Sequence, residues 1–149
     1  MLEIKLHPYH DTDYNFIYKT KKTLYKDYVV QNWGKWKEKD QKYFFKKYIE
    51  NNKKHISILV NNTAKIGFID YLTDNNYVEI GNICINKKYQ GNGIGSQILN
   101  EIINNNSNKT ISLQVFIQNE RAIKLYTKLG FKISSSSNTH HTMILEPRI

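Results

Sequence analysis

A glycine-rich run at Gln90–Gly95 constrains the fold of this chain more than any other segment. An apolar stretch at 80–85 precedes it, and residues 94–103 after it carry isoleucine and leucine at helical spacing. The segment is therefore predicted to be a strand, a tight turn and a helix N-terminus. The first N–H groups of a helix lack internal partners and attract anions, and glycine lets a backbone approach phosphate oxygens closely. The run predicts a phosphate-binding turn.

Two better-known phosphate-binding patterns do not fit this region. No Gly-Lys-Ser/Thr sequence ends the turn, and the segment that follows the helix, 104–110, holds no acidic residue to bind a ribose. A glycine-rich turn also occurs where a loop simply needs positive φ, so the turn alone leaves that alternative open. A nucleotide, if one binds, is held in another way.

Length and composition indicate one folded domain spanning 1–149, since 40% of the 149 residues are hydrophobic. No run approaches the ~20 apolar residues of a membrane span, and the first residues lack the apolar core of a signal peptide, so we expect a cytoplasmic protein with no membrane partner. The one cysteine, Cys84, lies in an apolar strand pattern. We expect a small buried side chain there, and neither a disulfide framework nor a metal site.

The net charge of +9 comes from 22 Lys and Arg residues against 13 Asp and Glu, and most of the basic residues are lysine. Two interpretations remain open. The lysines form a solvated surface, or they attract an anionic partner such as a nucleotide or a nucleic acid.

The pattern of apolar residues predicts an α/β fold. Strands are predicted at 2–6, 56–60, 65–71, 77–85, 111–117, 131–133 and 139–145, and helices at 11–31, 37–49, 94–104 and 120–129. Asn61 and Asn62 favour a turn, and Gly130 follows the last helix as a C′ glycine. This order predicts a mixed sheet of about seven strands flanked by four helices, with one parallel crossover at its middle.

Two motifs in this order resemble the GNAT superfamily of acetyl-CoA-dependent N-acetyltransferases. Gln90–Gly95 matches the family's Gln/Arg-x-x-Gly-x-Gly/Ala signature at every fixed position. Asn119–Phe131 matches its Asn-x-x-Ala-x-x-Leu-Tyr-x-x-x-Gly-Phe segment. The resemblance covers about 55–145, and it implies the GNAT fold, acetyl-CoA as the cofactor and acetyl transfer to a primary amine by direct attack in a ternary complex.

The resemblance also implies where coenzyme A lies. The strand before the turn exposes backbone N–H groups to the acyl group at Ile83, Cys84 and Ile85, and the turn clamps the pyrophosphate. The further residues that the resemblance assigns to coenzyme A are Gln90, Gly91, Asn92, Gly93, Ile94, Gly95, Ser96, Asn119, Ala122 and Tyr126. From the residues alone, the same amides at 83–85 are equally ordinary ladder groups of a sheet, and Asn119 is also a plausible N-cap.

Two residues are candidates for the chemistry of amine acetylation, which needs a neutral amine and a protonated leaving thiolate. In the family, a tyrosine at the position of Tyr126 donates a proton to the thiolate. The alternative role for Tyr126 is packing on the buried stripe of its helix. Glu79, eleven residues before Gln90, matches the glutamate base of the histone-acetylating branch. A partly desolvated carboxylate there would accept the amine proton, and the alternative is an exposed edge carboxylate. His140 and His141 are further candidates, although the alternation with Met143 suggests that one of them only packs.

Aromatic residues in and between the first two predicted helices are candidates in part for the core and in part for an acceptor wall, because ring faces suit cationic amines. The cluster consists of Tyr28, Trp33, Trp36, Tyr43, Phe44 and Phe45. Tyr28, Trp33, Phe44, Glu79 and His140 are the predicted substrate-binding residues. The acceptor is predicted to be a small-molecule or peptide amine, and the chain is predicted to be a monomer or a homodimer.

Two functions of other classes remain as alternatives. One is a non-catalytic module that binds or senses acyl-CoA, in which Glu79 would be dispensable. The other is a nucleic-acid-associated protein, suggested by the basic charge and the interleaved aromatic residues. Of these two alternatives, the nucleic-acid-associated protein is the less favoured, and we do not predict a nucleic-acid partner.

Overall fold

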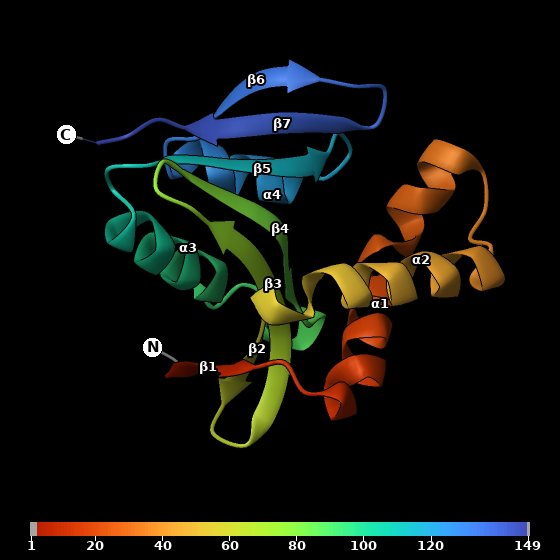
Figure 1. The fold of residues 1–149 in the computed structure, drawn as a ribbon. Helices are drawn as coiled ribbons and strands as arrows, with labels where there is room; N and C mark the ends of the chain where they lie inside the picture. The colour runs from red at the N-terminus through yellow and green to blue at the C-terminus, as the bar shows by residue number, and fades with distance from the viewer. Residues whose placement is uncertain (1–2, 149) are drawn as a thin grey trace. The chain divides into compact units, whose positions relative to one another are not determined.

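The computed structural model describes residues 3–148 and contains one seven-stranded mixed sheet with four α-helices (Figure 1). The strands are β1 Ile4–Pro8, β2 Ile56–Asn61, β3 Ala64–Thr73, β4 Tyr77–Ile85, β5 Thr110–Phe116, β6 Lys132–Ser136 and β7 His140–Leu145. The helices are α1 Tyr14–Trp33, α2 Glu38–Asn52, α3 Ile94–Asn105 and α4 Glu120–Lys128. Hydrogen bonds order the strands β1-β2-β3-β4-β5-β7-β6. The predicted fold class and the order of elements are confirmed.

The described residues form two compact units, each made of two stretches of chain. The first unit holds residues 3–70 and 82–92, and the second holds residues 71–81 and 93–148. Both β3 and β4 contribute residues to each unit, because the boundary falls within these strands.

The core of the first unit lies between helices α1 and α2 and strands β2 to β4. The buried side chains of this core are Ile17, Phe45, Ile49, Ile56, Ile58, Val60, Phe68 and Cys84. The alternation along β2 places every second side chain on the helix-covered face, as its antiparallel register with β3 requires. Burial of each aliphatic side chain of this kind contributes roughly 1.5–3 kcal/mol to the stability of the folded state.

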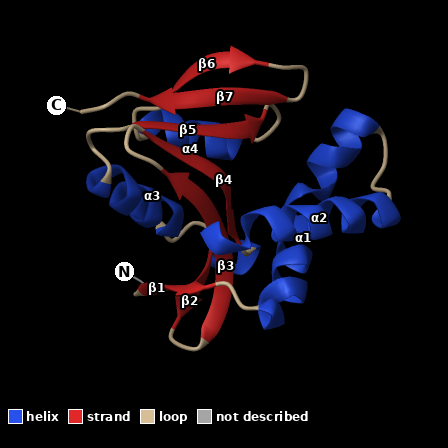
Figure 2. Ribbon diagram, in the orientation of Figure 1, coloured by secondary structure: helices blue, strands red, loops and turns tan. Residues whose placement is uncertain are grey.

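The second unit is built around α3, α4 and the ladder of β5, β7 and β6 (Figure 2). Helix α3 buries one complete face, consisting of Ile94, Ile98, Leu99, Ile102 and Ile103. This is the apolar stripe that the sequence pattern predicts. On β5, Ile111, Leu113 and Val115 are buried and alternate with polar residues. The parallel pairing of β4 with β5 confirms the predicted crossover through α3.

Local signals placed most element ends within two residues of their observed positions. Asn62 has φ 56° in the turn between β2 and β3, and Gly130 has φ 102° after α4, so both predicted turns are confirmed. The first strand runs 4–8 rather than 2–6, and Leu2 lies outside the described residues. Phe131 was expected inside the next strand, but it is buried just before β6, which extends to Ser136 because it pairs with β7.

Candidate functional site

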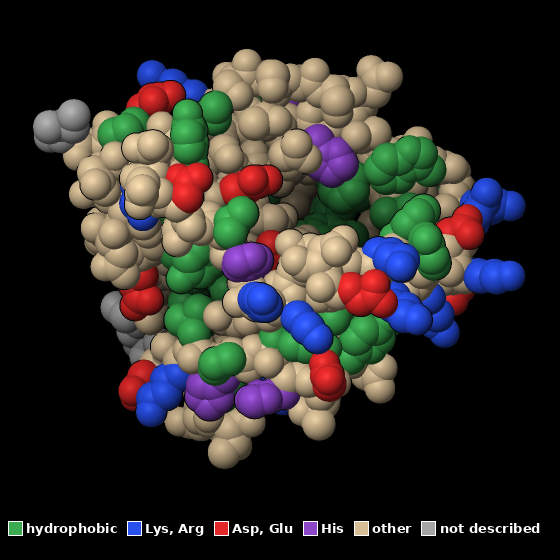
Figure 3. Space-filling model, in the orientation of Figure 1, with side chains coloured by type: hydrophobic (Ala, Val, Ile, Leu, Met, Phe, Trp, Pro, Cys, Tyr) green, Lys and Arg blue, Asp and Glu red, His purple; other side chains and the backbone are tan. Residues whose placement is uncertain are grey.

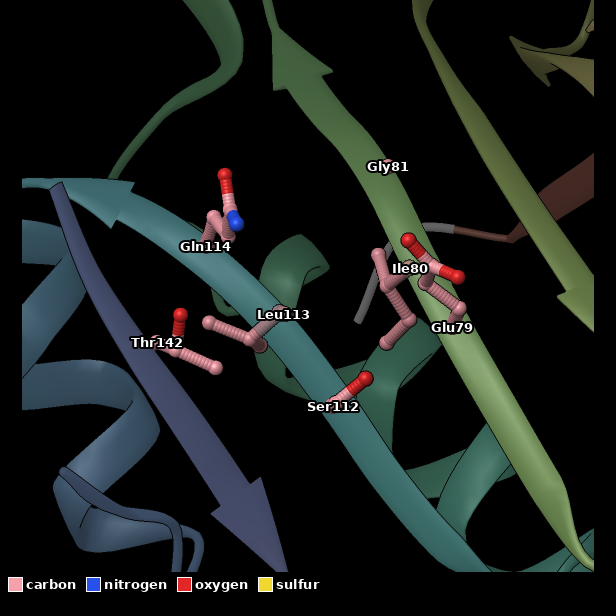
Figure 4. A pocket seen from close by; sticks show the side chains of 7 residues that line it. All are labelled: Glu79, Ile80, Gly81, Ser112, Leu113, Gln114 and Thr142. Atoms are coloured by element: carbon pink, nitrogen blue, oxygen red, sulfur yellow. The ribbon is translucent and has the colours of Figure 1, made fainter. Parts of the chain in front are cut away.

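The parallel ladder between β4 and β5 ends part-way along both strands. Its register runs from Tyr77↔Thr110 to Ile80↔Leu113, whereas β4 continues to Ile85 and β5 to Phe116. Around Gly81 and Gln114 the two ribbons diverge (Figure 4). Where a ladder ends, backbone N–H and C=O groups are available to another partner. The sequence could not predict this position, because the end of a ladder depends on how two segments distant in the chain approach each other.

A small cavity of about 130 Å³ lies in the second unit where this ladder ends. Its walls are Glu79, Ile80 and Gly81 from β4, Ser112, Leu113 and Gln114 from β5, and Thr142 from β7. Figure 4 shows Glu79 on β4 across from Ser112, with Gln114 and Thr142 along the same space. The cavity therefore combines one carboxylate with two hydroxyls and one amide.

Glu79 is exposed, so the expectation of a partly desolvated carboxylate is wrong. Its register partner Ser112 is half-buried, and Gln114 faces Thr142 across β5 and β7. An exposed carboxylate exchanges protons freely with water and with a bound amine. Sequence analysis did not single out Ser112, Gln114 or Thr142. The signal for the first two was their alternation with the buried residues of β5, which places them on one face of the sheet.

The glycine turn has the predicted backbone at two of its three glycines. Gly91 has φ 82° and Gly93 has φ 76°, values that side chains with a Cβ rarely adopt, and open space surrounds both positions. Gly95 has no positive φ and lies within α3, as the predicted helix over 94–104 requires, so Gly91 and Gly93 alone make the tight turn. The Gln90 side chain donates from Nε2 to the carbonyl of Ile85 at 2.8 Å, which ties the turn to the end of β4.

Helix α3 begins at Ile94 with Gly93 as its N-cap residue, and no side chain caps it within the described part of the chain. The first N–H groups of the helix, including those of Ile94, Gly95 and Ser96, have no intrahelical acceptor by position. Asn92, also predicted to contact the pyrophosphate, is exposed and donates from Nδ2 to the carbonyl of Tyr89 at 3.1 Å. A turn of this kind with uncapped helix amides fits a phosphate ligand.

Cys84 belongs to the core of the first unit, as predicted. It is 1% exposed, its thiol donates to the Tyr25 hydroxyl at 3.4 Å, and burial raises the pKa of the thiol to about 12. A thiol in this state is not a nucleophile at neutral pH. Its neighbours Ile83 and Ile85 are half-buried.

The backbone of β4 at Cys84 lies unusually close to β3. A Cβ on Gly67 would stand 2.0 Å from the carbonyl oxygen of Cys84 and 3.0 Å from the Cα of Ile85. Only glycine permits this approach, because the nearby atoms are backbone and cannot move aside. Gly67 thereby sets the path of the segment that the family resemblance assigns to the acyl group.

Helix α4 presents the second predicted wall. Asn119 Oδ1 accepts from the backbone N–H of Ala122 at 3.2 Å, so Asn119 is the N-cap. Tyr126 is 7% exposed and its ring lies 6.0 Å from that of Phe131. Packing on the buried stripe of α4 is therefore established for Tyr126, while its proton-donor role stays a prediction.

The predicted acceptor residues belong to both units. In the first unit, Trp33 and Phe44 are each 59% exposed and Tyr28 is half-buried, while Phe45 belongs to the core. Figure 3 shows hydrophobic and basic side chains interspersed over α1 and α2. In the second unit, the ring of His140 stacks on that of Phe116 at 4.2 Å.

The two histidines of β7 differ in their contacts. His140 Nδ1 lies 2.7 Å from the Thr139 hydroxyl, and burial lowers the pKa of the imidazole. His141 Nδ1 lies 2.6 Å from the hydroxyl of Ser136 on β6, and Met143 beyond it is buried. His140 is therefore largely neutral at pH 7 and presents a polar edge beside an aromatic ring.

Membrane-spanning helices and metal-binding clusters are both absent from the described residues. Within residues 3–148, no helix is long and apolar enough to cross a bilayer. The same part of the chain contains no group of three or more His, Cys, Asp and Glu side chains placed to hold a metal ion.

The model of the acetyltransferase (GNAT) family matches residues 18–131, which is most of the chain. The chain belongs to the GNAT acetyltransferase family. Membership confirms the predicted enzyme class, an N-acetyltransferase that uses acetyl-CoA. A search of curated proteins gave no match.

Solved structures of GNAT proteins share the fold over nearly their whole length. PaiA N-acetyltransferase from Thermoplasma acidophilum in complex with coenzyme A has a TM-score of 0.75 at 17% identity, covering 97% of this chain and 99% of that one. The ribosomal-protein-S18-alanine N-acetyltransferase from Escherichia coli has a TM-score of 0.69 at 19% identity, with coverage of 99% and 96%. PseH from Campylobacter jejuni in complex with acetyl coenzyme A has a TM-score of 0.63 at 22% identity, with coverage of 98% and 100%.

Proposed function

We propose that this GNAT protein acetylates a primary amine whose nitrogen binds beside Glu79, with residues 1–149 working as one acetyltransferase domain. The observation that carries the proposal is the cavity at the end of the β4–β5 ladder, where Glu79 lies with Ser112 and Gln114. The family match supports the single domain, because residues 18–131 include parts of both compact units.

Coenzyme A is held by the backbone of the glycine turn in this proposal. The uncapped N–H groups at the start of α3 bind the pyrophosphate, and Gly91 and Gly93 keep that surface free of side chains. The N–H groups of 83–85 lie along the acyl group, and Asn119 and Ala122 contact the pantetheine arm. Acetyl-CoA supplies an activated thioester there.

Glu79 and Tyr126 divide the proton transfers. The acceptor reaches the site as an ammonium ion, and the Glu79 carboxylate takes one proton so that the neutral nitrogen can attack the thioester carbon. The C–N bond forms as the C–S bond breaks, and the Tyr126 hydroxyl gives a proton to the departing thiolate. The second proton that the nitrogen loses returns through water to Tyr126 and restores its hydroxyl. The amine attacks directly, and the inert thiol of Cys84 supports a route without an acyl-enzyme.

The walls of the cavity favour a peptide or another polar amine over a purely apolar one. Ser112, Gln114 and Thr142 provide hydroxyl and amide groups within one small space, and such groups pair with the N–H and C=O groups that follow a peptide α-amine. The E. coli relative is named as acting on an alanine of a ribosomal protein, which agrees with this class of acceptor. Tyr28, Trp33, Phe44 and His140 contact the rest of the acceptor. We also propose that the enzyme is cytoplasmic and that it is a monomer or a homodimer. We propose no nucleic-acid partner for it.

The test follows release of free coenzyme A thiol with acetyl-CoA and a panel of peptide and small-molecule amines. Glu79→Gln is expected to lower kcat about 10²–10⁴-fold, because the general base is lost. The matched control is Glu101→Gln, an exposed glutamate on α3 of the same unit, which should leave turnover unchanged. Tyr126→Phe should lower kcat with little change in KM.

Two results would contradict these roles. Full activity of Glu79→Gln would remove that residue as the base, and an unaltered rate for Tyr126→Phe would remove the proton donor. Tight binding of acetyl-CoA without turnover of any amine would instead favour a non-catalytic acyl-CoA-binding module.

A further inference from the structure

Strands β5 and β7 of the second unit have one buried face and one accessible face. Leu113 on β5 and Met143 on β7 are register partners on the buried face. The side chains that alternate with them point to the other side of the sheet and are half-buried or exposed. This accessible face consists of three cross-strand pairs, which are Ser112 with Ile144, Gln114 with Thr142, and Phe116 with His140.

The cavity beside Glu79 occupies the first part of this accessible face. Glu79 is the register partner of Ser112, and Gln114 and Thr142 line the same cavity (Figure 4). Side chains on one face of a strand follow one another every two residues, which is about 6.8 Å. Phe116 therefore lies about 7 Å beyond Gln114 and about 14 Å beyond Ser112 along β5.

The pair of rings at the far end of this face is held in place by several contacts. The Phe116 and His140 ring centres are 4.2 Å apart with an interplanar angle of 31°, and His140 Nδ1 lies 2.7 Å from the Thr139 hydroxyl. The Ser137 hydroxyl accepts from the backbone N–H groups of Thr139 at 3.2 Å and His140 at 3.0 Å. A surface that is already ordered loses little conformational freedom when a ligand binds to it.

The three cross-strand pairs carry little charge, although the chain has a net charge of +9. None of the six side chains is Lys, Arg, Asp or Glu, and burial lowers the pKa of His140. A charged group of an acceptor would lose hydration beside the two rings without gaining an oppositely charged partner. An apolar side chain would instead be removed from water there.

We propose that Phe116 and His140 form a second acceptor subsite, which binds an apolar side chain of an extended peptide. This inference rests on the proposed function, in which the α-amine of the peptide lies beside Glu79. An extended peptide advances about 3.4 Å per residue, so the 7–14 Å along β5 corresponds to about two to four residues. The apolar side chain accordingly belongs to the third, fourth or fifth residue of the acceptor.

The experiment measures acetylation of a peptide series by the full chain, following release of free coenzyme A thiol. Each peptide begins with alanine, continues with serine and glycine, and carries one leucine at a single position from 2 to 8. A leucine at one of positions 3 to 5 should lower KM roughly five- to tenfold relative to the peptide without leucine. We expect little change in kcat, because this contact is remote from the thioester. Leucine at positions 7 and 8 should have no effect.

Variants of the two rings test whether they carry this preference. Phe116→Ala and His140→Ala should each remove most of the difference in KM between the leucine and serine peptides. The matched control is Ile133→Ala on β6, which removes an apolar side chain that is 51% exposed. Ile133 is the register partner of Met143 and so belongs to the opposite face, and its replacement should leave the preference unchanged. Partial misfolding lowers kcat for both peptides alike and leaves the ratio of their KM values intact.

Three results would overturn the subsite alone. The first is turnover of the peptides without any dependence on the position of leucine. The second is a leucine preference that persists in both Phe116→Ala and His140→Ala. The third is a raised KM for acetyl-CoA in these variants with an unaltered peptide preference, which would assign the two rings to the cofactor.

Two further results would reach beyond the subsite. Acetylation of small amines without acetylation of any peptide would overturn the subsite and the peptide class of acceptor, while leaving acetyl transfer itself in place. Tight binding of acetyl-CoA without turnover of any amine would overturn the proposed function together with this inference.

Discussion

The two compact units keep their polar side chains in opposite environments. In the first unit, Asp70 is 5% exposed and its Oδ2 accepts hydrogen bonds from Tyr48 and Asn82. In the second unit, Glu79 is exposed and lies with Ser112 in an open cavity. A buried carboxylate held by two donors fixes the strands that carry it, whereas an exposed one remains available to a substrate. The difference indicates that Asp70 serves the structure, and it leaves Glu79 accessible for the proposed chemistry.

Replacing Asp70 and Glu79 by alanine, one at a time, should give the largest difference in stability between the two units. Asp70→Ala removes the acceptor of the half-buried Tyr48 hydroxyl and Asn82 amide, so we expect it to lower the free energy of unfolding by about 3 kcal/mol. Glu79→Ala should change that free energy by no more than about 0.5 kcal/mol. Urea unfolding of both variants measures this, and equal losses would break the comparison.

Glycine substitutions test how tightly each unit is packed. Gly67→Ala in the first unit directs a Cβ to 2.0 Å from a backbone oxygen, so we expect a loss of about 2–3 kcal/mol in the free energy of unfolding. Gly93→Ala in the second unit meets no atom within 4 Å, and its cost of about 1–2 kcal/mol comes from φ 76° alone. Denaturant unfolding of both variants should rank them in this order; the reverse order would place the tighter packing in the second unit.

The smallest effect concerns Glu38, which belongs to the first unit but is partly exposed. Its carboxylate accepts hydrogen bonds from Lys22 Nζ at 2.7 Å, Tyr18 Oη at 2.8 Å and Trp36 Nε1 at 2.6 Å. These donors lower its pKa from 4.5 to about 2. Because the folded pKa is depressed, the stabilisation is complete above pH 4.5 and is lost as the pH falls toward 2.

Glu38→Gln should therefore be less stable than the wild type at pH 6, with the difference shrinking between pH 4.5 and 2. Thermal unfolding across this range measures the difference, and Glu50→Gln, at a glutamate whose Lys47 contact is 3.5 Å long, is the control. A difference that does not depend on pH would mean that shape rather than charge stabilises this position. We expect the difference in stability to be small because the Glu38 carboxylate is near water, which screens its interactions.

Local signals predicted much of this molecule. The strand at 77–85 and the start of α3 at Ile94 agree with their predicted bounds. Each is signalled by residues that lie next to one another in the sequence, a run of apolar residues for the strand and a glycine turn for the helix. Asn119 caps α4 for the same reason. The extension of β6 to Ser136 could not be predicted, since its serines form a strand only through pairing with β7.

The polar groups of the interior escaped prediction for a different reason. Tyr48, Asp70 and Asn82 are separated by 22 and 12 positions along the chain, and nothing in their own neighbourhoods distinguishes them from surface residues. Only packing of α1 and α2 on the strands brings these side chains together.

By itself, the sequence determined the order of elements, the glycine turn before α3 and membership of the GNAT family, because spacing along the chain carries all three. The tertiary structure decided where the β4–β5 ladder ends and which carboxylate is exposed. Those properties depend on burial and on contacts between distant segments. Burial can raise the free energy of a charged group by several kcal/mol, and the residues next to it in the sequence do not reveal whether it is buried.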